Sequence, residues 1–410
     1  MSDATLASAQ KSDAAGAKPS AREAANLQPD VTAITGRFPT RIRREVTRLY
    51  LSSPRVADLA TVYPGMLAAL AARRGASSSR MKALKLIDAG APLKTAARAL
   101  DMPMWMRRLP PEAFVRLPPT VPQSETFSRR IAARLPSPSD DCAFWLESVL
   151  FAEQASGENF ALWLAGQSVF TERSACEPMF SVLSAYAWFS LRPAVEGHRY
   201  IVVPWRPEIS FDTALCAAKS WFNRVRLVLQ LPPGTLDDCW LQPETVNGYS
   251  FMPLLDHTEI FAEAQAMQNC ADQFAERLAL GTCRLFSIRR AGQRVATLEV
   301  AQHEREVGIL SIRQLKARHN MPAATEVWQA AYAWLAKQDN LRRIPPLLAT
   351  RNLSALLDQP AWQRIMQPYR DDRGGAPWLD ETASYTQFCL FDQHMAELAR
   401  RGGVSSWLFT

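Results

Sequence analysis

The strongest constraint on how this chain can fold is a change of hydrophobic period near Gly281. Before it, apolar residues recur at helical spacing from Ile260 to Leu278, and Gly281 stands where such a helix would stop. After it, residues 283–290 and 294–301 alternate between apolar and polar side chains, as half-buried strands do. The change predicts one continuous helix followed by an antiparallel hairpin that closes through residues 291–293.

A third alternating segment, residues 307–314, extends the hairpin to a three-stranded antiparallel sheet. One face of this sheet is apolar and carries Phe286, Ile288, Leu298, Val300, Leu310 and Ile312. The other face carries Ser287, Arg289, Thr297, Glu299, Ser311 and Arg313, among which we expect cross-strand charge pairs. Gln314 has the parity of the apolar face, so the register requires the strand to end or bulge there.

Helical spacing dominates the rest of the chain, so the predicted fold class is α+β, with a helical N-terminal region and a C-terminal domain in which helices flank the small sheet. A β-branched run at 200–204 predicts one further short strand. Residues 1–36 contain almost no large apolar side chains and predict a disordered tail. The remaining predicted divisions are helical regions at 37–135 and 136–199, the α+β domain at 200–345, and a C-terminal extension at 346–410.

Composition bounds the class of protein without fixing it. The 410 residues include 47 Lys and Arg against 40 Asp and Glu, a net charge of +7, which permits contact with nucleic acid but equally describes a solvated surface. No apolar run reaches the ~20 residues of a membrane helix, and the N-terminus lacks the pattern of a secretory signal. The seven cysteines are scattered and form no Cys-x-x-Cys pair. We therefore expect reduced thiols and a cytoplasmic protein that does not enter a membrane.

Several enzyme signatures are absent from the sequence. The five histidines show no metal-ligand spacing with one another or with cysteine. The chain contains no P-loop, no Gly-x-Gly-x-x-Gly turn and no Gly-x-Ser-x-Gly elbow. We therefore expect no bound metal or cofactor, no P-loop nucleotide hydrolysis and no serine-hydrolase chemistry.

The polar residues between positions 263 and 320 resemble the PcfJ-like family, which was first named from conjugative plasmids. The family pattern contains a Glu-Gly helix start, a His/Asn-Cys pair, a Tyr, a Ser-x-Arg strand, a Thr-x-Glu strand and Gln-x-x-Gly-x-x-Asn. The matching positions are Glu263, Asn269, Cys270, Ser287, Arg289, Thr297, Glu299, Gln314 and Asn320. The chain departs from the pattern at Ala264, Phe274 and Ala317. The resemblance covers residues 205–337 and implies a link to plasmid, conjugation or mobile-element biology rather than a particular reaction.

The same stretch holds the densest side-chain chemistry and is the first candidate site. Glu299, Asn269 and Cys270 are the candidate catalytic residues, with the carboxylate as a general base and the thiol as a nucleophile. The candidate ligand-binding residues are Arg289, Thr297, Gln314 and Asn320. Three structural alternatives stay open: Cys270 as a buried thiol within a helix, a surface charge ladder around Glu299, and Asn320 as the cap of the next helix.

Residues 80–109 form the second candidate region. Helical segments at 81–89 and 93–100 flank Gly90-Ala91-Pro92 and resemble a helix-turn-helix unit. Its outward basic residues, Arg98, Arg107 and Arg108, are the candidate nucleic-acid contacts. An ordinary helical hairpin with an arginine-rich face is the alternative.

These observations leave three hypotheses for function. The first is a cytoplasmic, nucleic-acid-associated protein of a mobile element that binds DNA or RNA through its arginine-rich faces. The second is an enzyme that acts on a nucleotide-like ligand through a polar pocket around Glu299. The third is a structural or partner-binding module.

Overall fold

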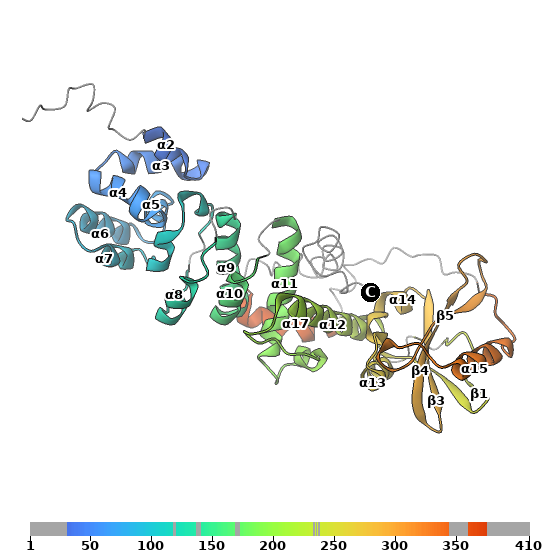
Figure 1. Cartoon of the computed structure of the whole chain (residues 1–410). Coiled ribbons are helices and arrows are strands. Elements are labelled where there is room, and N and C mark those ends of the chain that lie inside the picture. Colours follow the sequence, from blue (N-terminus) through green and yellow to red (C-terminus); the bar gives the residue numbers. More distant parts are fainter. Residues whose placement is uncertain are drawn as a thin grey trace, which may run out of the picture. The chain divides into compact units, whose positions relative to one another are not determined.

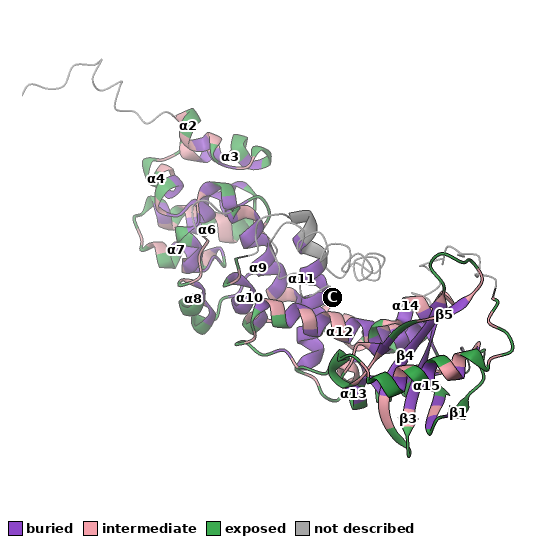
Figure 2. Ribbon diagram, turned by 45° about the vertical axis from the view of Figure 1, so that its right-hand side comes forward, coloured by how far each residue is buried: buried purple, intermediate pink, exposed green. Residues whose placement is uncertain are grey.

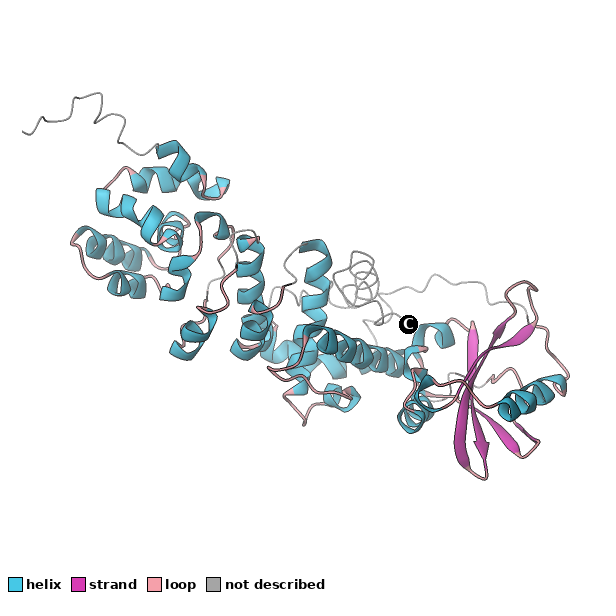
Figure 3. Ribbon diagram, in the orientation of Figure 1, coloured by secondary structure: helices cyan, strands magenta, loops and turns pink. Residues whose placement is uncertain are grey.

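The structure is a computed structural model that describes residues 31–117, 120–136, 141–168, 173–232, 234, 236, 238–343 and 360–374. The chain divides into two compact units, Met1–Gln123 and Ser124–Thr410, which we call unit 1 and unit 2 (Figure 1). The described part of unit 1 is helical, whereas the described strands all lie in unit 2 (Figure 3). The fold is therefore α+β, with the sheet in the C-terminal half of the chain.

Unit 1 is built around the short apolar helix α5. Every residue of α5 is buried, because its sequence, Pro-Gly-Met-Leu-Ala-Ala-Leu-Ala, has no polar face. The hydroxyl of Tyr63 donates to the carbonyl of Pro103 at 2.6 Å and fixes the following 3₁₀ helix η1. The elements of unit 1 are α2 (Val31–Gly36), α3 (Thr40–Tyr50), α4 (Pro54–Val62), α5 (Pro64–Ala71), α6 (Ser77–Asp88), α7 (Leu93–Ala99), η1 (Met104–Arg108) and η2 (Pro111–Ala113).

Two sequence predictions for unit 1 can be compared with these elements. Helix α2 occupies the last six residues of the segment predicted as a disordered tail, and residues 1–30 lie outside the described part. Helices α6 and α7 form the predicted helical pair, joined where Gly90 adopts φ 74° and the amide of Ala91 donates to the carbonyl of Leu86. This left-handed glycine and the bond that spans five residues are the Schellman arrangement that ends a helix.

Unit 2 begins with a helical layer whose main helices are largely buried. Figure 2 colours most of α9 and α11 as buried, which agrees with the low exposure of their Trp, Phe and Leu side chains. The elements of this layer are α8 (Glu125–Ile131), α9 (Cys142–Ser156), α10 (Glu158–Ala165), α11 (Arg173–Ser190), η3 (Glu196–Tyr200), α12 (Phe211–Gln230) and α17 (Pro360–Arg373). Helix α17 returns to this layer from the far end of the described chain, and Trp188 Nε1 donates to Asp372 at 2.6 Å.

The strand predicted at 200–204 is wrong. Residues up to Tyr200 form the 3₁₀ helix η3, and residues 201–204 are irregular. The hydroxyl of Tyr186 bonds the carbonyl of Val203 and so holds this segment against α11. Val202 and Val203 are exposed, so the contact with α11 is made by the backbone, and the β-branched run does not pair with another strand.

The described sheet has five antiparallel strands in the order β1-β2-β3-β4-β5, two more than predicted. They are β1 (Glu244–Val246), β2 (Tyr249–Pro253), β3 (Cys283–Arg290), β4 (Gln293–Gln302) and β5 (Leu310–Lys316). The first two were not predicted, because they are short and flanked by Pro243 and Pro253. Asn247 and Gly248 join them with φ values of 52° and 77°, the paired positive angles of a tight hairpin turn.

The predicted apolar face of the sheet is confirmed. Phe286, Ile288, Leu298 and Val300 are fully buried against Trp334 of α15 (Thr325–Ala336). The predicted bulge is also present, since Val300 pairs with Ile312 whereas Glu299 pairs with Gln314, which leaves Arg313 as the extra residue. The bulge moves Gln314 from the apolar face to the face that carries Glu299.

The opposite face of the sheet is covered as well, so it is not half-exposed. Cys283, Leu285 and Ala301 pack against residues of α12, α13 and α14 in a second core. The elements on this side are α13 (His257–Met267), η4 (Ala271–Gln273), α14 (Ala275–Ala279) and, after β5, η5 (Arg318–Asn320). In Figure 1 α15 and the α13–α14 pair flank the sheet on opposite sides. Polar residues of the inner strands are therefore buried under helices.

The predicted continuous helix over 260–278 is wrong in its middle. Helix α13 begins at His257, with Asp256 accepting from Thr258 N and Glu259 N, but it ends at Gln268 in the left-handed conformation with φ 47°. Asn269 then accepts a hydrogen bond from Ala271 N at 3.1 Å, which stabilises the break. Cys270 consequently lies in a turn rather than on the face of a helix.

Candidate functional site

A buried hydrogen-bond network joins the break after α13 to strand β4. Glu263 is fully buried, and Arg294 Nε donates to its Oε2 at 2.8 Å. The Thr297 hydroxyl donates to Glu263 Oε1 at 2.7 Å and accepts from Asn269 Nδ2 at 2.8 Å. Both polar ends of the Asn269 side chain are thus used within the protein. This residue orients the turn that carries Cys270 rather than offering a free group to a ligand.

A second buried carboxylate, that of Glu299, lies on β4 two residues after Thr297. Glu299 is 2% exposed and forms an ion pair with Arg277 of α14 through Oε1. Its Oε2 accepts no hydrogen bond from any residue that the structure describes. A buried carboxylate oxygen without a donor is costly, so this atom is a point where a bound group could supply a hydrogen bond.

Glu299 lines a small cavity between strands β3 to β5 and the segment that follows α13, on the helix-covered face of the sheet. The cavity is about 20 Å³, room for one water-sized group. We call it the Glu299 cavity, and its other lining residues are Asn269, Cys270, Ala271, Phe274, Leu285, Thr297, Gln314, Lys316 and Asn320. Six of the predicted site residues therefore meet here: Asn269, Cys270, Thr297, Glu299, Gln314 and Asn320.

A wider groove adjoins this cavity. It has a volume of about 670 Å³ and shares Asn269, Cys270 and Asn320 with the Glu299 cavity. We call it the amide groove, because five side chains along it are carboxamides: Gln265, Gln268, Asn269, Gln273 and Asn320. Its volume is in the range of small-molecule sites.

The charged residues of the amide groove differ in their surroundings. Arg224 donates to Asp272 at 2.9 Å, and burial raises the pKa of Asp272 although this arginine opposes the rise. Arg199 lies on the same groove and is exposed. The Arg224–Asp272 ion pair fixes α12 against η4, whereas the guanidinium of Arg199 faces solvent.

The state of Cys270 argues against a nucleophilic role. Burial raises the pKa of its thiol, and the nearby Asp272 acts in the same direction. Its Sγ lies 3.7 Å from Oδ1 of Asn320, an amide that cannot take a proton as a base. Cys270 is therefore a neutral thiol at neutral pH, which contributes surface to the cavity but lacks the activation that a nucleophile needs.

The predicted charge pairs on the sheet are wrong. Arg289 donates to Ser287 at 3.3 Å and does not line the Glu299 cavity, because it sits four residues from Leu285, the β3 partner of Glu299. Arg313 is the bulged residue and bonds Glu304 instead. The cap predicted at Asn320 is absent too, since α15 begins after Ala324.

Sequence reasoning missed the arginines that neutralise the two buried glutamates. Arg294 lies at the start of β4, three residues before Thr297. Strict alternation would place these two residues on opposite faces of the sheet, but the pairing of β3 with β4 is irregular near Arg289, which breaks the alternation. Arg277 comes from α14 and reaches Glu299 only because the helix breaks and re-forms. Glu263, the partner of Arg294, matches the PcfJ-like pattern but was not among the predicted site residues. Long-range ion pairs of this kind leave no local sequence signal.

Unit 1 carries a different kind of candidate surface. Met1–Gln123 contains 19 basic and 9 acidic residues, a net charge of +10, whereas Ser124–Thr410 contains 28 and 31, a net charge of −3. The modest +7 of the whole chain hides this division. A charge asymmetry between halves is typical of proteins that bind a polyanion through one part.

The predicted nucleic-acid contacts are all exposed on unit 1. Lys94 and Arg98 are one turn apart on α7, so they share a face, and Arg107 and Arg108 follow on η1. Arg107 Nε donates to the carbonyl of Val62 at 3.0 Å, which orients its guanidinium. Carboxylates are scarce here, and the ion pairs described within this unit are Arg37–Glu112 and Arg48–Glu45.

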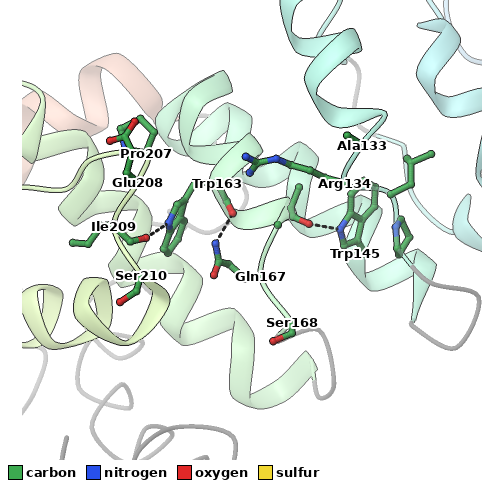
Figure 4. A pocket seen from close by; sticks show the side chains of 14 residues that line it. Ala133, Arg134, Trp145, Trp163, Gln167, Ser168, Pro207, Glu208, Ile209 and Ser210 are labelled. Carbon is green, nitrogen blue, oxygen red and sulfur yellow. Dashed lines mark hydrogen bonds between the residues drawn. The ribbon is translucent and has the colours of Figure 1, made fainter.

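The largest cavity described in unit 2 is structural in character. It has a volume of about 770 Å³ and lies beside Trp145 and Trp163 (Figure 4). Both indoles donate to backbone carbonyls, of Ala165 at 3.2 Å and Ile209 at 2.8 Å. Gln167 and Arg134 likewise bond the carbonyls of Trp163 and Leu162. These polar groups hold α8, α10 and the segment before α12 together.

Comparison with known proteins assigns no class to this arrangement. No protein-family model matches the chain, and it matches neither a curated protein nor a solved structure. Among the residues that the structure describes, no helix has the length and apolarity needed to cross a membrane.

Proposed function

We propose that the protein binds nucleic acid, DNA or RNA, through the basic surface of unit 1. The observation that carries this proposal is the charge division: a net +10 on Met1–Gln123 against −3 on the remainder. Polyanion binding releases counterions from the phosphate backbone, and clustered Lys and Arg are the side chains that do this. The resemblance to a family named from conjugative plasmids supports a role in mobile-element biology in the cytoplasm.

Helix α7 and the following 3₁₀ helix η1 supply the proposed contact. Lys94 and Arg98 on α7 share one exposed face, and Arg107 and Arg108 lie on the next element. Helix α7 has seven residues, so it is short for reading many bases. We therefore expect contacts to phosphates, which position a nucleic acid without strong sequence preference.

The test is a fluorescence-anisotropy titration with labelled single- and double-stranded DNA and RNA over a series of salt concentrations. The full chain should bind with an affinity that falls steeply as salt rises. The double variant Lys94→Ala/Arg98→Ala should weaken binding to all sequences alike and reduce the salt slope by about 2, one for each lost phosphate contact. Absence of binding at 50 mM salt would overturn the proposal.

A charge-matched control separates a specific surface from general electrostatics. Arg313 and Lys337 are exposed residues of unit 2, each paired with a glutamate. The double variant Arg313→Ala/Lys337→Ala removes the same two charges from the other unit. It should leave both affinity and salt slope unchanged, and an equal loss in the two variants would refute a site on α7.

A second candidate function is ligand binding in unit 2, as in the hypothesis of an enzyme acting on a nucleotide-like ligand. The specific observation in its favour is the unpartnered Oε2 of Glu299 beside a cavity that adjoins the amide groove. Glu299→Gln should remove the binding of a ligand that donates to Oε2, and any activity that depends on the carboxylate, without unfolding the chain. A ligand screen that compares these two proteins by thermal shift tests it.

A further inference from the structure

Glu299 presents one satisfied and one unsatisfied oxygen, although its side chain is 2% exposed. Arg277 donates to Oε1 and so occupies that oxygen of the carboxylate. The remaining oxygen has no donor among the described residues and borders the Glu299 cavity. A group that fills this cavity must therefore supply an N–H or O–H donor.

The same cavity also offers donors beside that acceptor. Lys316 carries an ammonium group, and Gln314 and Asn320 carry carboxamides. An ammonium donates only, and an amide can donate through its nitrogen. The cavity thus places an acceptor next to donors, which complements a ligand edge that carries a donor next to an acceptor.

The cavity has room only for the tip of a ligand, whereas the amide groove, which shares three lining residues with it, has room for the rest. A volume of about 20 Å³ takes one small group, whereas the adjoining groove of about 670 Å³ takes a whole small molecule. Phe274 and Leu285 give the cavity apolar walls, and Arg277 lies over the Phe274 ring at 5.2 Å. Flat, partly apolar ligands with polar edges suit such a site.

Backbone conformation supports a binding role at the junction of the two spaces. Gln268, His319 and Asn320 have positive φ values of 47°, 59° and 56°, although none is a glycine. Such conformations are strained for residues other than glycine and cluster at ligand sites. Gln268 and Asn320 both line the amide groove.

We propose that unit 2 binds a nucleobase that carries an exocyclic amine, with the amine in the Glu299 cavity. The amine donates to Glu299 Oε2, and the adjacent ring acceptor receives a hydrogen bond from Lys316 or a neighbouring carboxamide. Carboxylates accept from base amines in this way, and carboxamides pair with base edges. The sugar and phosphate lie along the amide groove, where the exposed Arg199 pairs with the phosphate.

This inference rests on the second candidate function and not on the basic surface of unit 1. It assigns the ligand class of that site and predicts binding of single nucleotides, which the unit 1 surface does not require. The Lys94→Ala/Arg98→Ala variant should therefore bind nucleotides as the unaltered chain does.

The test is isothermal titration of the full chain with matched pairs of nucleoside 5′-monophosphates. Cytidine and uridine monophosphates form one pair, and adenosine and inosine monophosphates form the other. Each pair differs mainly in the exchange of an amine for a carbonyl. The amine-bearing member of at least one pair should bind tenfold to a hundredfold more tightly, since its partner would face Glu299 with an acceptor. Equal affinity within both pairs, or no binding at millimolar concentration, would overturn the proposal.

Glu299→Gln gives the sharper result. The glutamine can still accept from Arg277 while it turns its amide nitrogen toward the cavity, so the preference should invert in favour of the carbonyl-bearing nucleotide. Glu304→Gln removes the same charge from an exposed position and should change nothing. A folded Glu299→Gln protein that keeps the original preference would refute the assigned contact, and if this variant fails to fold, the matched pairs still decide the proposal with the unaltered chain.

Arg199→Ala provides the second readout. It should reduce the advantage of a monophosphate over its nucleoside while it leaves the amine preference intact. A ligand that has no amine could raise the unfolding temperature of the unaltered chain but not that of Glu299→Gln. This result would support the second candidate function but overturn the nucleobase assignment. Polynucleotide binding by unit 1 is measured separately and survives either outcome.

Discussion

The hydroxyl of Thr297 on β4 donates to Oε1 of the fully buried Glu263 on α13 at 2.7 Å. The Thr297 hydroxyl oxygen also accepts from Asn269 Nδ2, so one hydroxyl connects a strand, a helix and the turn that follows the helix. Arg294 completes the partners of Glu263. The Glu299 cavity is thereby built on a network whose polar members are held by one another, which keeps Asn269 and Cys270 in place beside it.

Thr297→Val should destabilise the protein by about 2–3 kcal/mol, because it leaves Glu263 Oε1 and Asn269 Nδ2 without their partner at nearly unchanged volume. Urea unfolding followed by circular dichroism measures the loss. Thr245→Val is the matched control, since this exposed threonine of β1 bonds only the Ser250 hydroxyl among the described contacts. The control should stay within about 0.5 kcal/mol of the unaltered chain. Similar effects of the two substitutions would contradict a special role for the Thr297 hydroxyl.

Arg294→Met should cost about 3 kcal/mol, because it strands the Glu263 charge in the interior. The double variant Arg294→Met/Glu263→Gln should recover part of that loss, since the uncompensated charge is gone. A double-mutant cycle on unfolding free energies quantifies the coupling. Additive effects, with no recovery in the double variant, would show that the two side chains do not depend on each other.

Cys270 should react slowly with iodoacetamide near neutral pH, because burial raises its thiol pKa and the thiolate is the reactive form. The rate should rise roughly tenfold for each pH unit below that pKa. Peptide mapping by mass spectrometry gives the rate at Cys270, with free glutathione as the reference. Labelling faster than glutathione at pH 7 would indicate an activated thiol and would restore the nucleophile hypothesis.

The attachment of α17 should weaken in acid. The indole N–H of Trp188, with Arg373 and Arg192, lowers the pKa of Asp372 in the folded chain. A carboxyl whose pKa is lowered by folding stabilises the fold above its unfolded pKa of about 3.9 and loses that contribution as the pH falls through the folded value. Hydrogen exchange of residues 360–374 should therefore show protection at pH 7 that declines below about pH 4.

Asp372→Asn is the control for this dependence. The asparagine can still accept from Trp188, but it has no charge for Arg192, so protection at pH 7 should be lower and should not change over the acidic range. Protection in the unaltered chain that is equal at pH 3 and pH 7 would show that the carboxylate contributes nothing to the docking of α17.

Sequence reasoning was most successful where a period continued over many residues. The alternation in β3 and β4 located the apolar face, and the parity of Gln314 required the bulge that the structure contains at Arg313. The helical spacing that dominates the rest of the chain is likewise confirmed in α12 and α15. In each case burial against a neighbouring layer repeats at every turn or every second residue, so the pattern is redundant.

The predictions failed where a single residue changes the chain direction. Gln268 ends α13 in a left-handed conformation that nothing in its residue type favours, and the helical spacing of apolar residues carries on through the break. Strands β1 and β2 are too short to establish a period. The composition of the Glu299 cavity was largely predicted, but its ion pairs were not, because Arg277 and Arg294 approach the glutamates only in three dimensions.

The Trp188–Asp372 contact has a consequence for the order in which the chain can be completed. Helix α11 lies before the five strands in the sequence, and α17, which packs on it, lies after them. During synthesis, α17 can complete the helical layer only after the whole sheet has been synthesised. The sheet domain is thus an insertion within the helical layer. A chain truncated before residue 360 would leave the Trp188 side of that layer uncovered.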